Sequence, residues 1–545
     1  MIKKRGFIRN TVILFFAMVI TKGLGAALKI PLANILGGEG MGYYTNAYSI
    51  FTPVLAFACS GIPLIVTRRV AQYVACHRYS EAEKVKRCSL LLAVFIGIMG
   101  TALIYIAAIP FVSFIANSSE SLLSVLIIAP AVLFCSVTGV YRGYYEGLND
   151  MLPTALSQVI EAIVKAALGI SLSYFTYIKA IEIMNSEAAA LPYASAAAIL
   201  GVSLSELCGT VFMLIRGRKK SDSFREYKEK MKLSEIWELS FGIFRESLPV
   251  ALGAAAANLL SLADMLTVAN CINLSVQYFG FIPERTIECS DIGNFMYGSY
   301  SGLVMSIYML AAAVSVLISR CALPRLTCEA EAGKKHFGRE MKLLYKGTAL
   351  ISAPVGIFLA VLAEPVLNIL YSSRADEVFV SVMPLTVLSL GGVISAAFGA
   401  VLTVFQSCGD FRFPVKTALI HGALKLILNI VLIPLPFMNI TGAALATVLS
   451  DFICLLYSLN VLKKRYCSEK LLLSSFFSPV LSALISGTIL YFIHNILKES
   501  MSGLMAVIIS GCTAVVIYTV LIFIFDRESF RALYSCIKNK LVKSC

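Results

Sequence analysis

The stretch Gly503–Phe525, GLMAVIISGCTAVVIYTVLIFIF, decides the fold class because none of its side chains is charged. As an α-helix rising about 1.5 Å per residue, it is long enough to cross the hydrocarbon core of a bilayer, which is about 30 Å thick. Similar apolar stretches recur along the whole chain, separated by charged or Gly/Pro-containing segments. We therefore predict an all-α polytopic membrane protein with about 14 transmembrane helices.

The predicted spans lie near residues 10–35, 44–67, 88–114, 121–141, 154–176, 189–215, 247–270, 298–319, 347–371, 378–405, 414–437, 440–462, 472–496 and 503–525.

Composition supports a membrane protein and argues against an enzyme. Hydrophobic residues make up 58% of the sequence and charged residues 14%, with a mean hydropathy of +0.82, whereas soluble domains carry about 25% charged residues. The sequence contains no phosphate-binding loop, no HExxH and no G-x-S-x-G motif, so we expect neither ATP hydrolysis nor hydrolytic chemistry. Its 15 cysteines form no CxxC pattern, so we expect no metal site of that kind. Cys271 and Cys289 fall in one predicted outer loop, and the sequence does not decide whether they form a disulfide bond.

The basic residues are distributed as the positive-inside rule requires. The formal net charge is +14, and 37 of the 46 Lys and Arg residues fall in segments that lie on one side of the predicted membrane. This asymmetry indicates membrane topology rather than a nucleic-acid partner. It predicts that both termini are cytoplasmic.

The chain divides into three parts. The charged connection at 216–237 separates an N-lobe (1–235, helices 1–6) from a C-lobe (236–466, helices 7–12), and 467–545 adds helices 13 and 14 with a basic tail. A shift of 260 residues aligns Glu161 with His421 and Lys165 with Lys425, in the fifth helix of each lobe. Parallel repeats of this kind are a known transporter plan, with substrate sites near the midplane between the halves.

Four lysines lie deep within the predicted helices: Lys22, Lys29, Lys165 and Lys425. An ionisable group at a helix centre costs on the order of 2.5–3.5 kcal/mol on insertion scales, so each needs a compensating interaction. Lys29 follows Lys22 by seven residues and lies on the same helix face. We predict that these side chains line a substrate path. For Lys29, snorkelling to the interface is the alternative.

Four acids lie at comparable depth: Glu161, Glu206, Asp264 and Asp451. Glu161 could pair with Lys165 one turn away and neutralise it. Asp264 could bind a coupling Na⁺ through oxygen ligands, or only form hydrogen bonds between helices. We also assign Glu161 and Asp451 to the group of candidate cavity acids for ion coupling. His421, one turn from Lys425, could carry a proton or serve as a packing residue.

Several sequence segments resemble a known family. They include TKGLGAALKIPLANILGGEGMGYYTNAYSIF (21–51), YRGYYEGLNDMLPTALSQVIEAIVK (141–165) and YGSYSGLVMSIYMLAAAVSVLISRCALPRLTCEAEAG (297–333). These resemble the SpoVB-type polysaccharide biosynthesis proteins of the multidrug, oligosaccharidyl-lipid and polysaccharide exporter superfamily. The resemblance extends in order from about residue 5 to 465.

The resemblance implies two six-helix lobes plus two helices, alternating access, and an undecaprenyl-diphosphate-linked saccharide as cargo. Basic residues of the first, second and eighth helices would meet the diphosphate. Those places are filled here by Lys22 and Lys29, by Arg69 or its neighbour Arg68, and by Arg320. Glu39 lies near an acid of the family's first outer connection. Helices 13 and 14 would receive the lipid tail.

These observations predict a monomeric flippase in the bacterial cytoplasmic membrane that moves a lipid-linked cell-wall or polysaccharide precursor, such as a lipid II-like unit. Membrane lipids would surround it, cell-wall synthesis enzymes are candidate partners, and the only cofactor expected is a coupling Na⁺ or H⁺. A cation-coupled multidrug exporter is the alternative, favoured by the deep acids. A scaffold without transport activity is a third class, in which the cavity charges would be dispensable.

Overall fold

The protein is described by a computed structural model that covers residues 4–223, 232–279, 291–331, 337–410, 412–435, 437–466 and 469–526. Every regular element within these ranges is a helix. The all-α prediction is therefore confirmed for this part of the chain.

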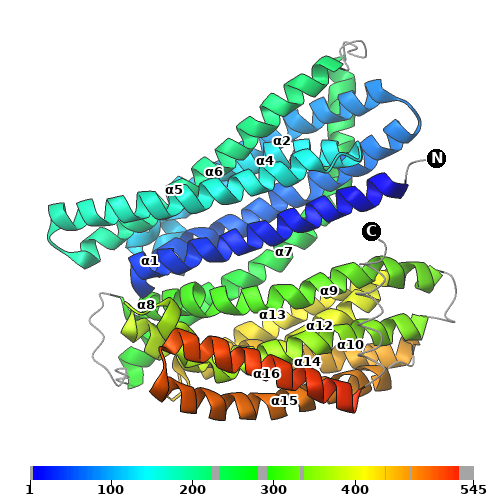
Figure 1. The fold of residues 1–545 in the computed structure, drawn as a ribbon. Helices are drawn as coiled ribbons and strands as arrows, with labels where there is room; N and C mark the ends of the chain where they lie inside the picture. The colour runs from blue at the N-terminus through cyan, green and yellow to red at the C-terminus, as the bar shows by residue number, and fades with distance from the viewer. Residues whose placement is uncertain are drawn as a thin grey trace. The chain divides into compact units, whose positions relative to one another are not determined.

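The chain forms two compact units. Unit 1 contains Met1–Leu274 and Thr286–Gly302, and unit 2 contains Ser275–Arg285 and Leu303–Cys545. The elements of unit 1 are α1 (Lys4–Ala75), α2 (Tyr79–Pro110), η1 (Phe111–Ile115), η2 (Ser119–Ser121), α3 (Leu122–Ile128), α4 (Ala131–Gly147), α5 (Leu152–Met184), α6 (Glu187–Ser223), most of α7 (Leu233–Phe279), and α8 (Ile292–Ser299) (Figure 1).

The longer segment of unit 2 begins at Leu303, inside the short π-helix η4 (Tyr300–Val304). Its helices are α9 (Met305–Glu331), α10 (Phe337–Val361), α11 (Ala363–Leu370), α12 (Ala375–Ser407), α13 (Arg412–Leu432), α14 (Asn439–Tyr466), α15 (Glu469–Ser500) and α16 (Gly503–Phe525). The sequence-based lobe boundaries at 235 and 466 stay a prediction.

Eleven helical segments among the described residues are long and apolar enough to cross a membrane. The first, Ile20–Ala75, runs for 56 residues, about twice the length that a bilayer needs. It holds two of the predicted spans because Gly37 interrupts the helix with φ 62° and ψ −169°, a conformation that favours glycine. The predicted spans at 247–270 and 298–319 fall within α7 and within α8, η4 and α9.

The predicted ninth span, 347–371, differs from the structure. Its helix α10 begins earlier, at Phe337, and ends at Val361, and the short helix α11 follows. Pro365 lies in the first turn of α11 and has no N–H to donate to the carbonyl of Val361. The helix therefore restarts at this point.

In unit 1, apolar side chains of four helices, α1, α2, α4 and α7, form one core. Ile62, Val66 and Val70 of α1 pack with Val85 of α2 and Val140 of α4. The neighbouring helices α5 and α6 run side by side as a hairpin (Figure 1). Asn185 ends α5 in the left-handed conformation, with φ 52°, which asparagine tolerates better than most residues.

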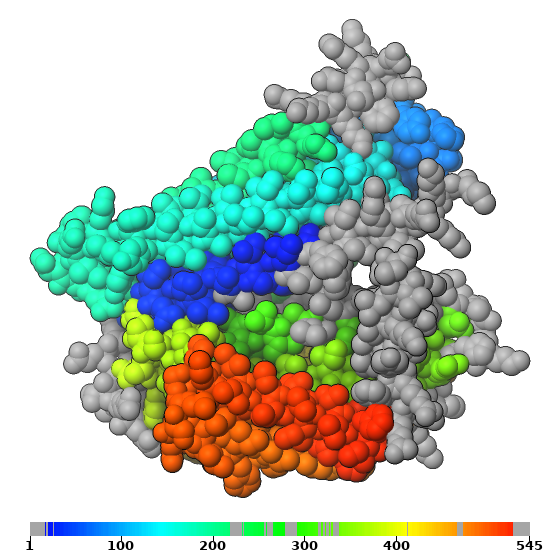
Figure 2. Space-filling view, in the orientation of Figure 1, coloured from blue at the N-terminus to red at the C-terminus, as the bar shows by residue number. Residues whose placement is uncertain are grey.

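In unit 2, the last two helices pack against α10 and against each other. Tyr518 of α16 donates a hydrogen bond of 2.9 Å to the carbonyl of Leu350. Lys346 Nζ lies 2.8 Å from Asp526 Oδ2, with both side chains largely buried. Figure 2 shows α15 and α16, orange to red, at the surface of unit 2, where Val516 and Ile524 are exposed. Exposed apolar side chains on a spanning helix are suited to lipid.

The close approach of α8 to α1 depends on glycine. A Cβ on Gly298 would lie 1.7 Å from the carbonyl oxygen of Gly38 and 2.4 Å from the backbone nitrogen of Gly42. Beside this contact, Asn46 donates hydrogen bonds to Ser121 and Asn294, and Asn294 donates one to Ser118. Small residues allow helix backbones to approach closely in membranes, and polar side chains then bond across the contact.

We therefore predict that Gly298→Ala lowers the free energy of unfolding by about 1–3 kcal/mol, the range for overpacking a tight contact. Chemical unfolding in detergent, followed by circular dichroism, measures the change. Gly399→Ala is the matched control, because a Cβ at Gly399 of α12 meets no atom within 4 Å. Equal stability of the two variants would contradict the account.

Candidate functional site

A group of three ammonium groups gathers in unit 1. Lys22 and Lys29 come from α1 and Lys165 comes from α5, and Lys29 lies within electrostatic range of both others. Lys22 is exposed, whereas Lys29 and Lys165 are partly buried. None of the three makes an ion pair within the part of the chain that the structure describes. We call this set the lysine group.

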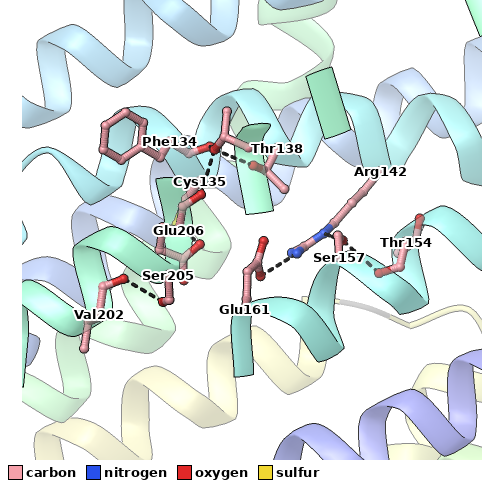
Figure 3. A network of polar contacts seen from close by, with 11 residues as sticks. Phe134, Cys135, Thr138, Arg142, Thr154, Ser157, Glu161, Val202, Ser205 and Glu206 are labelled. Atoms are coloured by element: carbon pink, nitrogen blue, oxygen red, sulfur yellow. Dashed lines mark hydrogen bonds and ion pairs between the residues drawn. The ribbon is translucent and has the colours of Figure 1, made fainter. Parts of the chain in front are cut away.

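Lys165 does not pair with Glu161, although the two residues are one turn apart. Its Nζ lies 5.0 Å from the ring centroid of Tyr48, a cation–π distance. Glu161 Oε2 instead accepts a hydrogen bond of 2.5 Å from Arg142 of α4, whose Nε donates to Ser157 at 3.0 Å (Figure 3). The proposed Glu161–Lys165 ion pair is therefore replaced by a Glu161–Arg142 ion pair.

The side chain of Glu161 packs directly against Gly209 of α6, where a larger residue would collide with it. A Cβ on Gly209 of α6 would lie 1.9 Å from Glu161 Oε1. This oxygen is buried and has no hydrogen bond partner among the described residues. Glu206, also on α6, is close enough to Glu161 for electrostatic interaction and accepts a hydrogen bond of 3.0 Å from Cys135. Two carboxylates and one guanidinium therefore share the interior of unit 1.

Arg69, at the end of the predicted second span, has a carboxylate partner. Its Nη2 lies 2.7 Å from Oε1 of Glu246 on α7. A substrate diphosphate at Arg69 would have to compete with Glu246. Glu39 is buried and accepts a hydrogen bond of 2.8 Å from Tyr43, so it is part of a packed polar contact.

In unit 2, Asp451 of α14 lies beside His421 of α13, with 3.0 Å between Oδ1 and Nε2. Ser395 of α12 donates a hydrogen bond to the other carboxylate oxygen. Lys425, one turn from His421, is partly buried. The side chains of Arg320 and Asp264 lie outside the described residues, as does Cys289.

Sequence reasoning missed Arg142 and Glu246 as members of these clusters. The predicted fourth span ends at residue 141, just before Arg142, but α4 continues to Gly147 and places Arg142 against Glu161. Glu161 itself indicates such a partner, because a carboxylate deep in the membrane needs a cation. Lys165 is not the only cation close to it in the sequence, since Arg142 also lies near.

The fold and these clusters define a multi-pass membrane protein, with charged groups held inside helical units. Residues 7–328 match the family model described as polysaccharide biosynthesis protein. The chain belongs to this family.

Two curated relatives cover most of the chain. Stage V sporulation protein B of Bacillus subtilis is 24% identical over 451 residues, which is 82% of this chain and 81% of the relative. Lipid II flippase MurJ of Bacillus subtilis is 21% identical over 471 residues, 84% of this chain and 82% of the relative.

Solved structures share the fold. A lipid II flippase MurJ in an inward closed conformation has a TM-score of 0.66 at 16% identity, over 96% of this chain and 99% of that one. An inward-facing multidrug resistance MATE family transporter has a TM-score of 0.63 at 13% identity, over 84% and 99%. These matches are to transporters and not to enzymes, and they confirm the predicted fold class.

We predict that Arg142→Ala lowers the free energy of unfolding by about 3–5 kcal/mol, because it leaves Glu161 buried without its cation. Arg142→Ala combined with Glu161→Gln should recover most of that loss, since no charge then remains unpaired. Thermal unfolding of purified protein measures both, and Arg245→Ala, at an exposed position of α7, is the control. The account is wrong if the double variant loses as much as the two single variants together.

Proposed function

We propose that the protein is a flippase that carries an undecaprenyl-diphosphate-linked saccharide from the inner to the outer leaflet of the cytoplasmic membrane by alternating access. A peptidoglycan precursor resembling lipid II or a polysaccharide unit is the proposed cargo. Family membership and the two relatives support transport of this class. Both termini are placed in the cytoplasm in this proposal.

The observation that carries the proposal is the lysine group. Three like charges repel one another, and each is costly inside a bilayer unless an anion or water compensates it. A diphosphate brings several negative oxygens to one place and accepts charge-assisted hydrogen bonds from ammonium groups. An anionic headgroup at Lys22, Lys29 and Lys165 therefore supplies the charge that no carboxylate among the described residues supplies.

The alternative, a cation-coupled multidrug exporter, would need free acids, but the described deep acids have partners. Glu161 has Arg142, Asp451 has His421, and Glu206 accepts a hydrogen bond from Cys135. A cationic drug would have to displace these contacts, whereas a diphosphate would find lysines without ion pairs. The fold does not distinguish a flippase from a multidrug exporter, because a MATE family transporter has a similar fold.

Replacing Lys22 and Lys29 together by Gln should abolish complementation of a flippase-deficient bacterium, because two of the three ammonium groups are removed. Protein levels on immunoblots should stay normal. Lys179→Gln with Lys498→Gln, two exposed lysines outside the predicted cavity, is the matched control and should complement fully. Full rescue by the Lys22/Lys29 variant would reject the assigned site.

Lipid analysis identifies the cargo. Depletion of the protein in its native host should cause one lipid-linked intermediate to accumulate, and the saccharide of that intermediate identifies the substrate.

Overexpression of the protein should not raise the resistance of cells to cationic dyes, whereas overexpression of a multidrug exporter would raise it.

We further propose Na⁺ as a coupling ion at Asp264, through the hard oxygen ligands that this cation prefers. Transport in vesicles should then depend on sodium, and Asp264→Asn should remove that dependence while leaving the protein folded. An unchanged sodium dependence in the variant discards this part of the proposal.

A further inference from the structure

A cluster of polar side chains from four helices lies in the middle of unit 2. Asp451 of α14 contacts His421 of α13 and Ser395 of α12, and Tyr308 of α9 donates a hydrogen bond of 3.2 Å to Ser395. Asp451 is 8% exposed. His421 Nε2 also lies 3.0 Å from Ser450 Oγ, and the imidazole stacks on Phe398. We call Tyr308, Ser395, His421 and Asp451 the C-cluster.

The same arrangement recurs in unit 1. A shift of 260 residues places Tyr48, Cys135 and Glu161 on Tyr308, Ser395 and His421. The acids Glu206 and Asp451 correspond with a shift of 245, and each directly follows a Leu-Ser pair, 204–205 and 449–450. We call Tyr48, Cys135, Glu161 and Glu206 the N-cluster.

One hydrogen bond corresponds as well as the positions. Cys135 donates to Glu206 as Ser395 donates to Asp451. Glu161 is within electrostatic range of Glu206, and Tyr48 is within range of both Cys135 and Glu206. The four positions and the hydrogen bond to the acid therefore recur in the two units, whereas the tyrosine hydrogen bond to Ser395 belongs to the C-cluster and the Tyr48 hydroxyl has no hydrogen-bond partner among the described residues.

The two clusters differ in their cationic groups. In the N-cluster, Arg142 supplies a permanent charge to Glu161. The residue that the 260-residue shift places opposite Arg142 is Leu402, which is apolar. The C-cluster therefore has no permanent cation at this place, and the group in contact with Asp451 is a histidine, whose charge can be removed.

Few other ionisable groups surround the C-cluster. Tyr308 comes from α9, Lys425 lies one turn from His421 on α13, and Cys454 lies on α14 within electrostatic range of Asp451. Helix α12 carries no ionisable side chain between Glu377 and Cys408. Histidine is the one side-chain type among these whose ordinary pKa lies near neutral pH.

We propose that the His421–Asp451 pair is a proton-binding site of unit 2. A proton taken from water binds to a ring nitrogen of His421, and the pair changes from a net charge of −1 to zero. Removing that net charge is favourable at mid-membrane depth, where an isolated ion is poorly solvated. Only the use of this proton to drive transport rests on the function proposed above; proton binding itself does not.

Histidine-selective ¹⁵N NMR of the full-length protein in detergent tests the site without any substrate. The chain has only four histidines, His77, His336, His421 and His494, and His421→Gln assigns the signal. We expect His421 to titrate in the wild type, and its midpoint to fall by about one pH unit or more in Asp451→Asn, because the anion that favours imidazolium is gone. Asp410→Asn, an acid outside the cluster that pairs with Arg465, should leave the midpoint unchanged.

An identical His421 midpoint in Asp451→Asn and the wild type would overturn the proposal, as would the absence of titration between pH 4 and 10. An unchanged His494 signal shows that the variants are folded. A second readout is the external pH dependence of complementation, which His421→Gln should flatten if the proton drives transport. If the wild type does not complement but His421 titrates as expected, only the proposed function fails.

Discussion

Water is scarce in the hydrocarbon core of a membrane, so every ionised side chain placed there needs a partner, a path to water or a ligand. Most of the architecture of this protein follows from that constraint. Glu161 pairs with Arg142 in unit 1, and Asp451 pairs with His421 in unit 2. Each pair connects two helices of its own unit. The lysine group has no ion-pair partner in the described part of the chain, and this imbalance is the basis for the anionic cargo that we propose.

The two units have corresponding helices, but the charged side chains at corresponding positions differ. At corresponding positions, Glu161 of unit 1 pairs with Arg142, whereas His421 of unit 2 contacts Asp451, and Arg142 has an apolar counterpart, Leu402. Hydrogen bonds from Cys135 and Ser395 keep the acids in equivalent places. The repeat thus preserves geometry while the chemistry of each site changes.

The sequence predicts the fold class well, because apolar length and charge asymmetry are enforced by the bilayer along the whole chain. It predicts helix ends less well, since the break at Pro365 and the extension of α4 past residue 141 depend on local backbone geometry. It identifies the deep charges but not their partners. Glu161 had two reachable cations, and only packing shows that Arg142, rather than Lys165, contacts it.

The central claim, that the lysine group recognises a diphosphate, is tested most directly by native mass spectrometry of the purified protein with two synthetic polyprenols. One carries a saccharide diphosphate and the other carries the same saccharide through a neutral linkage. The account predicts that the diphosphate lipid binds, that inorganic pyrophosphate displaces it, and that the neutral lipid binds far more weakly. Equal binding of the two lipids would contradict it.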